Sequence, residues 1–329
     1  MMHQRNQRYR KKRGGALISA LFIMALSAII ATALIVEEQL LIHEGRLVIN
    51  ADHAYLALQN AEDFAKMAIE NYVIQWPIGS QPSATSQIKP LENPLKSITL
   101  NGLTVSTTLE SAQGRFNIND LAYPKNQQNF GILLKILVPT LSKAQADAIA
   151  QSITAWIMTG KDDPYYASLN PPYRSAKNQL VSISELRLVR GMTPAIYNAV
   201  APYLTALPIV MPVPSSTSQQ GVLTLIDINA ATTPVLMAVN PGLHLMQVES
   251  MVDCRKAFGA FSSLQNFITN CAIPSGISSV QDVTTQSQYY LVQAKTSANH
   301  TVLTMNSLMM TQITKDNKLK VKMVWQSFE

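Results

Sequence analysis

The first 75 residues have a hydrophobic pattern that changes character at residue 36. From Gly14 to Val36 the chain has no charged residue, and its polar side chains are those of Ser19, Ser27 and Thr32. These 23 residues are long enough, at about 1.5 Å per residue, to cross a hydrocarbon core of about 30 Å as a helix. The pattern therefore predicts a membrane-spanning segment.

The helical pattern continues beyond the apolar run. Apolar residues recur at three- and four-residue spacing from Leu40 to Tyr72, while polar residues, including Glu62 and Asp63, occupy much of the remaining circumference. The spacing predicts one helix of about 55–60 residues whose second half is amphipathic, ended by Trp76-Pro77. We expect its apolar stripe to pack on a sheet or another domain.

The rest of the chain alternates between strand and helix patterns. The stretches "SITL" and "LTVSTTLE" are joined by Asn101-Gly102, which predicts a β-hairpin. The middle of the chain predicts short helices, and "QYYLVQAKT", "TVLTMNSLMMTQI" and "KVKMVWQS" predict closing strands. A helical block between two groups of strands indicates an α+β protein with an inserted α-helical domain.

The net charge of +6 comes from the first 13 residues. Without their six basic residues, 20 basic residues balance 20 acidic ones, which argues against a large nucleic-acid footprint on the folded part. The positive-inside rule places the basic flank in the cytoplasm and everything after Glu37 outside. A cleaved secretory signal is the alternative, but its apolar region is usually about 7–15 residues.

The chain has two cysteines, Cys254 and Cys271. Outside the cytoplasm a disulfide between them would contribute about 3 kcal/mol in the chain-entropy model. Two separate buried thiols are the alternative. The sequence has no CxxC or His-rich spacing typical of zinc or redox sites.

The segment "RYRKKRGGALISALF" places glycines between the basic cluster and the apolar run. Together with the long helix and the following strands, it resembles the type IV pilin fold, whose precursors carry a basic leader that a membrane peptidase cuts after a glycine. The resemblance implies that Arg13, Gly14 and Gly15 carry prepilin cleavage. It favours a cut after Gly14, or one residue later if Gly15 is the cut-site glycine.

Most pilins carry a glutamate at the fifth position after the cut, where this chain has Ser19, or Ala20 under the other cut. No carboxylate follows until Glu37. The same departure occurs in the type II secretion system protein K family, the large minor pseudopilins found at the tip. The stretches "GRFNINDL", "SELRLVRGM" and "LIDINAATTPVLMAV" are similar to that family as well.

The resemblance to this family implies a fold and a set of partners. The fold is pilin-like, with a long N-terminal helix packed on an antiparallel sheet and a large inserted α-domain that contains helix-hairpin-helix-like motifs. The implied partners are the I- and J-type minor pseudopilins, prepilin peptidase and the inner membrane, with no nucleic acid expected. The expected divisions are a cleaved leader (1–14), a transmembrane half-helix (15–36), a pilin-like periplasmic body (37–120 and 280–329) and the α-domain (121–279).

The family also binds calcium in the α-domain, and this implies a candidate Ca²⁺ site at Asp162 and Asp163 in "GKDDPYYASLN". Carboxylate and carbonyl oxygens are the ligands that calcium prefers. Met158 stands where the family generally carries an acid, so one carboxylate is missing. The alternative is that the two aspartates cap a turn before Pro164.

A rival function rests on "NPGLHLMQVES", which resembles a helix-hairpin-helix of membrane-anchored DNA receptors. Its hairpin, Gly242-Leu243-His244, lacks the second glycine that lets the backbone approach a phosphate. "LRLVRGMTPAIYNAV", with Gly191-Met192-Thr193, is interpreted as a weaker second copy. A minor pilin of a type IV pilus is a further alternative. No catalytic motif is present, and an enzyme is not expected.

Overall fold

The computed structural model describes most of the chain. The leader, Trp76, Pro77, Asn101 and Asp162 lie outside the described residues. The described ranges are 15–75, 87–88, 91, 97–100, 102–160, 163–210, 223–271, 282–298, 301–314 and 318–328.

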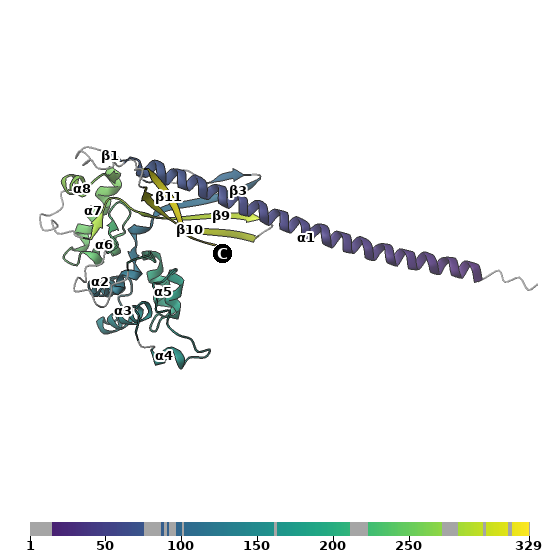
Figure 1. The fold of residues 1–329 in the computed structure, drawn as a ribbon, viewed down its shortest axis with the longest axis horizontal. Coiled ribbons are helices and arrows are strands. Elements are labelled where there is room, and N and C mark those ends of the chain that lie inside the picture. The colour runs from purple at the N-terminus through teal and green to yellow at the C-terminus, as the bar shows by residue number, and fades with distance from the viewer. Residues whose placement is uncertain are drawn as a thin grey trace, which may run out of the picture.

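One helix dominates the molecule. Helix α1 (Gly15–Val73) has 59 residues, which confirms the predicted single long helix. Figure 1 shows its first half projecting beyond the rest of the protein, while its second half lies along the sheet. The projecting half has no protein partner, so its backbone groups are paired within the helix itself.

The sheet is antiparallel, with the strand order β11-β10-β9-β3-β2. Strand β2 reaches β3 through the predicted two-residue turn, since Leu100 and Leu103 are partners. Gly102 has a φ of 80°, a left-handed conformation that glycine adopts without strain. The strands are β2 (Ile98–Leu100), β3 (Leu103–Ser111), β9 (Tyr289–Ala298), β10 (Thr301–Ile313) and β11 (Leu319–Phe328).

A β-bulge between β10 and β11 changes which face the last residues of the chain occupy. The register shifts between Leu308 and Met309, so that Met309 pairs with Met323 but Leu308 pairs with Trp325. A one-residue shift exchanges the two faces of a strand. Trp325 therefore packs with Leu308 and Leu207 on the face away from α1, and the next residue of β11 points to α1.

The helical domain lies beside one end of the sheet (Figure 1). Its core is continuous and includes Phe130, Ile153, Leu186, Leu236 and Phe267, all buried. The helices are α2 (Pro124–Leu137), α3 (Lys143–Ile157), α4 (Pro164–Ala167), α5 (Pro194–Val200), α6 (Thr233–Val239), α7 (Leu245–Phe258) and α8 (Leu264–Asn270), with the 3₁₀ segments η1 (Ala112–Gly114), η2 (Ile118–Ala122), η3 (Ile183–Leu188) and η4 (Ala201–Tyr203). Short strands link them: β1 (Gln87–Ile88), β4 (Phe116–Asn117), β5 (Leu204–Thr205), β6 (Ile226–Asp227), β7 (Ala260–Phe261) and β8 (Val283–Thr284).

The chain leaves the sheet earlier than the sequence indicates. β3 ends at Ser111, and both Phe116 and Ile118 are already buried in the core of the helical domain. The predicted boundary at residue 121 thus lies inside that core. The chain returns to the sheet at Tyr289.

A buried asparagine organises the first half of the helical domain. Strand β4 pairs in parallel with β5. Just after β4, the side-chain oxygen of Asn119 accepts the backbone N–H of Leu180 at 2.8 Å. Its amide nitrogen donates to the carbonyls of Leu180 and Leu207 at 2.9 and 3.0 Å. One side chain therefore holds two distant segments together.

A second, half-buried asparagine repeats this arrangement. Strand β6 pairs in parallel with β8. Asn229 accepts the N–H of Phe261 at 2.8 Å and donates to the carbonyls of Phe261 and Thr285 at 3.0 and 2.9 Å. The helical domain therefore consists of two units of the same design, one starting at β4 and the other at β6.

The hairpins of the two units also match. In the α2–α3 hairpin the N–H of Ser142 donates to the side chain of Gln145, and in the α6–α7 hairpin the N–H of His244 donates to Gln247, both at 2.8 Å. The segment Gly191-Met192-Thr193, interpreted from the sequence as a weaker second copy, lies between η3 and α5, which Thr193 caps. The α2–α3 hairpin is a further match to the Gly242 hairpin that the sequence analysis did not identify.

Gly114 is a close-packed point between the two units. A Cβ at this position would lie 2.7 Å from the Cβ of Ala230 and 2.9 Å from its carbonyl carbon. We expect Gly114→Ala to lower the free energy of unfolding by about 1–3 kcal/mol, because backbone has to move to make room. Thermal unfolding of the full chain in detergent would measure it.

Gly160→Ala is the matched control for this change, since, apart from its chain neighbours, no atom of the described residues lies within 4 Å of its Cβ position. Equal unfolding temperatures for the two variants would contradict the close packing of Gly114 against Ala230.

Candidate functional site: the long helix and its seating on the sheet

The projecting half of α1 is apolar on all sides. The hydroxyl of Ser19 donates to the carbonyl of Gly15 at 2.8 Å, and those of Ser27 and Thr32 bond back to their own helix in the same way. Polar side chains satisfied within the helix are compatible with a hydrocarbon surrounding. Among the described residues, this is the one helix long and apolar enough to span a membrane.

The face of α1 that lies on the sheet is built from small residues. Ala54, Ala57, Ala61 and Ala65 are all buried, and Ile69 packs with them against the strands. Alanines bring the helix backbone close to the sheet, so that residues of β3, β9 and β10 fill the space below. Of the stripe that the sequence predicts, Leu58, Ala61, Ile69 and Tyr72 are buried, and the prediction is confirmed for these positions.

The opposite face of the same stretch exposes large apolar side chains. Leu56, Phe64 and Met67 are 51%, 41% and 57% exposed, and Tyr55 is exposed at the edge of the sheet, where it contacts Phe328. Tyr55 and Phe64 therefore do not belong to the buried stripe that the sequence predicted. Apolar residues on a face turned away from the protein's own sheet are typical of a surface that another helix covers.

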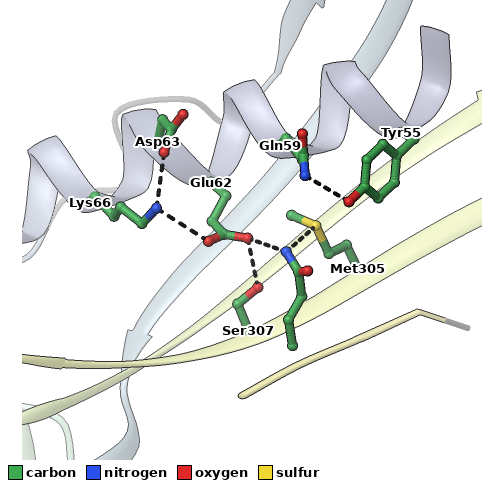
Figure 2. A network of polar contacts seen from close by, with 8 residues as sticks. Tyr55, Gln59, Glu62, Asp63, Lys66, Met305 and Ser307 are labelled. Carbon is green, nitrogen blue, oxygen red and sulfur yellow. Dashed lines mark hydrogen bonds and ion pairs between the residues drawn. The ribbon is translucent and has the colours of Figure 1, made fainter. Parts of the chain in front are cut away.

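A carboxylate lies inside the contact between α1 and the sheet. Glu62 is 2% exposed. Its Oε2 accepts the hydroxyl of Ser307 at 3.1 Å and the side-chain amide of Gln326 at 2.6 Å. Lys66 lies 3.6 Å from its other oxygen, Oε1. Figure 2 shows this carboxylate pointing from α1 toward the strands, between Lys66 and Ser307.

The burial of Glu62 corrects the sequence analysis, which placed this residue on the polar circumference of the helix. A buried carboxylate is costly unless hydrogen bonds and a counter-charge compensate it. Here Ser307 of β10 and Gln326 of β11 donate the hydrogen bonds, and Lys66 on the next turn of α1 provides the counter-charge. The helical spacing did indicate burial, since Glu62 lies between Leu58 and Ile69 on the same side of the helix as the buried alanines. A charged residue at such a position is nevertheless ordinarily predicted to face solvent.

A second buried carboxylate lies in the first helical unit. Asp120 is 3% exposed and accepts the backbone N–H and the hydroxyl of Thr224 at 3.3 and 3.2 Å. Burial raises the pKa of Asp120 to about 7, despite the opposing effect of these hydrogen bonds. This aspartate therefore binds a proton more tightly in the folded chain than in the unfolded one.

A third buried carboxylate lies where the second unit meets the sheet. A cavity of about 360 Å³ is lined by Tyr72 and Leu109 from the body and by Asp227 and Arg255 from the second unit. Burial raises the pKa of Asp227 to about 6, against the opposing effects of hydrogen bonds and of Arg255. The end of α1 and the helical domain therefore line the same cavity.

The candidate calcium loop has its described carboxylate already engaged. Asp163 accepts the N–H of Tyr165 at 2.9 Å, as the N-cap of α4, and its other oxygen lies 3.7 Å from Arg190. No group of three His, Cys, Asp or Glu side chains that could hold a metal occurs in the described ranges. The described residues of this loop therefore do not fit a carboxylate-rich calcium site.

The hairpin at Gly242-Leu243-His244 offers few cations to a phosphate. Lys256 pairs with Asp253 at 3.0 Å. Arg255 points inward and donates to the carbonyls of Ile228 and Ala231 at 2.6 and 2.7 Å. The cations of α7 are therefore already paired or turned inward, which disfavours the DNA-receptor alternative.

The two cysteines join α7 to the residue after α8. Cys254 and Cys271 form a disulfide, with their Cα atoms 5.7 Å apart. Of the residues that the sequence assigns to cleavage, Gly15 begins α1, whereas Arg13 and Gly14 lie outside the described residues.

Comparison with known proteins relates this arrangement to a family. The family model described as "Type II secretion system (T2SS), protein K" matches residues 114–209, which contain the first helical unit. The chain is also similar to proteins named type II secretion system protein K. The chain is thus similar to the type II secretion system protein K family over most of its length.

The similarity to individual members of this family is moderate. The relative from Pectobacterium carotovorum is 28% identical over 60% of this chain and 64% of its own length. The relative from Pseudomonas aeruginosa is 26% identical over 78% of this chain and 76% of its own. That from Klebsiella pneumoniae is 25% identical over 80% and 81%, respectively.

A solved structure of this family shows the same fold. A chain of the crystal structure of the GspK-GspI-GspJ complex from the enterotoxigenic Escherichia coli type 2 secretion system matches 87% of this chain and 99% of its own length. The TM-score is 0.65 at 21% identity. The predicted fold class, a long helix on an antiparallel sheet with an added helical domain, is confirmed.

Loss of the Glu62 carboxylate should loosen α1 from the sheet. We expect Glu62→Ala to lower the free energy of unfolding by about 2 kcal/mol, since Ser307 and Gln326 lose their acceptor and a cavity remains. Thermal unfolding of the full chain in detergent would measure it. Glu44→Ala, an exposed glutamate of the same helix, is the control, and an equal effect of both changes would contradict the role of Glu62.

The buried Asp120 should make stability depend on pH. Because its folded-state pKa of about 7 lies above the ordinary value of 3.8, its stabilising contribution is complete below pH 3.8 and is lost as the pH rises to about 7. Relative to the natural chain, Asp120→Asn should be more stable at pH 8 by up to about 3 kcal/mol, and this difference should shrink toward pH 5. Denaturant unfolding across this range would measure it. The exposed Asp253→Asn is the control, and parallel pH profiles for the natural chain and Asp120→Asn would refute the shift.

Proposed function

We propose that the chain is a minor pseudopilin at the tip of the type II secretion pseudopilus, where it initiates or caps assembly for the export of folded proteins across the outer membrane. One observation carries this function: a pilin-like helix with no carboxylate in its first half joins a sheet that bears a broad helical domain on one side (Figure 1). The similarity to the protein K family agrees with it.

The apolar half of α1 supports a position above the other subunits. A buried amino terminus needs a counter-charge, which pilins generally receive from a glutamate of a neighbouring subunit. Ser19 has no charge, and its hydroxyl is bonded to the carbonyl of Gly15. A subunit without this glutamate has less need to dock beneath an earlier one.

The proposed partners are the I- and J-type minor pseudopilins. The similar solved chain comes from a GspK-GspI-GspJ complex. On this chain, the exposed face of α1 around Leu56, Phe64 and Met67 provides the apolar surface that partner helices of this kind would cover.

The proposed location is the bacterial inner membrane, crossed once by residues 15–36, with the bulk of the chain in the periplasm. The single apolar helix supports membrane attachment, and the basic leader supports the orientation. Prepilin peptidase would cut after Gly14. The function proposed is structural and does not require catalysis by this chain.

One purification tests processing and assembly together. The tagged chain is purified from its own membranes, with and without active prepilin peptidase, and both its intact mass and its co-purifying proteins are determined by mass spectrometry. We expect residues 1–14 to be lost when the peptidase is active, and the smaller minor pseudopilins to co-purify. Leu56→Glu with Met67→Glu should lower partner recovery at least about tenfold, because charges then have to be buried in the contact.

Val302→Glu is the matched control, since Val302 is exposed on β10 instead of α1. It should leave partner recovery unchanged. A full-length chain in both samples would contradict pilin-type processing and favour the DNA receptor. Correct processing with type IV pilus proteins as partners would instead identify a minor pilin of that machine.

A further inference from the structure

The loop between α3 and η3 is fastened to the end of α3 by a lysine. The backbone N–H of Lys177 donates to the carbonyl of Trp156 at 2.9 Å, and its ammonium donates to the carbonyl of Ala155 at 3.2 Å. The last carbonyls of a helix lack partners within the helix and carry partial negative charge. Lys177 therefore supplies both hydrogen bonds and a positive charge where the helix needs them.

An arginine fastens the same loop at α4. The guanidinium of Arg190 lies 3.7 Å from the free oxygen of Asp163, the residue that caps α4. Its central carbon lies 4.9 Å from the centre of the Tyr165 ring. Its backbone N–H donates to the hydroxyl of Tyr166 at 3.2 Å. One residue thus contacts the cap and both aromatic side chains of α4.

Aromatic rings provide the floor of this loop. Tyr166 is buried, and its ring centre lies 5.2 Å from that of Trp156 and 5.4 Å from that of Tyr173. The hydroxyl of Tyr173 donates to the carbonyl of Leu188 at 2.8 Å. The aromatic cluster packs the loop onto the core, while the two cations hold its polar atoms.

These contacts engage described oxygen atoms of the kind that calcium binds. Calcium takes about six to eight oxygen ligands. Both carboxylate oxygens of Asp163 and the carbonyls of Ala155 and Trp156 already have protein partners. A guanidinium beside Asp163 also repels a second cation.

We propose that Lys177 and Arg190 take the place of a bound calcium ion in this chain, so that the described residues of this loop, 158–160 and 163–177, keep their fold without metal. This inference concerns the loop alone and holds whatever machine the chain serves.

The first test compares the full-length chain in detergent with excess EDTA and with millimolar CaCl₂. Two readouts are recorded: the thermal unfolding temperature, and the rate at which chymotrypsin cuts at the tyrosines of residues 158–177, identified by fragment mass. We expect the unfolding temperature to differ by less than about 1 °C between the two conditions, because an ion that does not bind the folded state cannot stabilise it. The cleavage rates should be equal.

Arg190→Gln tests the cation directly. We expect loop cleavage to become about five to ten times faster, and the unfolding temperature to fall by about 2–4 °C, the loss expected from one half-exposed ion pair and one cation–π contact. Arg190→Lys keeps the charge and should restore part of the protection. Arg187→Gln is the matched control, since Arg187 lies 4.4 Å from the centre of the Tyr197 ring, outside the loop.

Two outcomes would overturn the proposal. If CaCl₂ raises the unfolding temperature of the natural chain by several degrees and slows cleavage in the loop, a metal ion holds the loop. If Arg190→Gln is cut no faster than Arg187→Gln, the Arg190 guanidinium does not hold the loop in place.

Discussion

The seating of α1 on the sheet is the constraint on which the rest of the fold depends. Half of this helix leaves the protein, so the other half has to hold it in place with a narrow strip of contacts. Alanines such as Ala57 and Ala61 bring the backbones together, but small side chains alone specify little about register. Glu62 specifies the register, because in this position its carboxylate accepts hydrogen bonds from Ser307 and Gln326. A shift of α1 along the sheet would leave the buried carboxylate without these partners.

The last strand connects this seating to the helical domain. The bulge near Leu308 turns Gln326 toward α1 and Trp325 toward Leu207 on the opposite face. Strand β11 thus contacts both α1 and the helical domain. Tyr72 near the end of α1 and Asp227 of the helical domain also line one cavity, so the two parts of the molecule meet in two places.

Much of this architecture could be predicted from the sequence, since periodicity locates α1, the hairpin at Gly102 and the short helices. Periodicity assigns charges to solvent, however, so it misplaces Glu62, whose partners lie far away in the sequence. It also misses Asn119 and Asn229, because in the sequence an asparagine whose amide has three backbone partners resembles an ordinary turn asparagine. The sequence does not show that the two hairpins are equivalent, because their first helices differ in length: α2 has 14 residues and α6 has 7.

At corresponding positions of the two units, the first has an ion pair and the second a disulfide. Arg190 follows Leu180 by ten residues, and Cys271 follows Phe261 by ten, where Leu180 and Phe261 are the equivalent partners of the two asparagines. Within the second unit, Cys271 is joined to Cys254 of α7 by a disulfide, whereas within the first unit Arg190 contacts Asp163 at the start of α4 by charge. The two units share one continuous apolar core, so these links add to that core at the outer segment of each unit, and the disulfide is the stronger of the two.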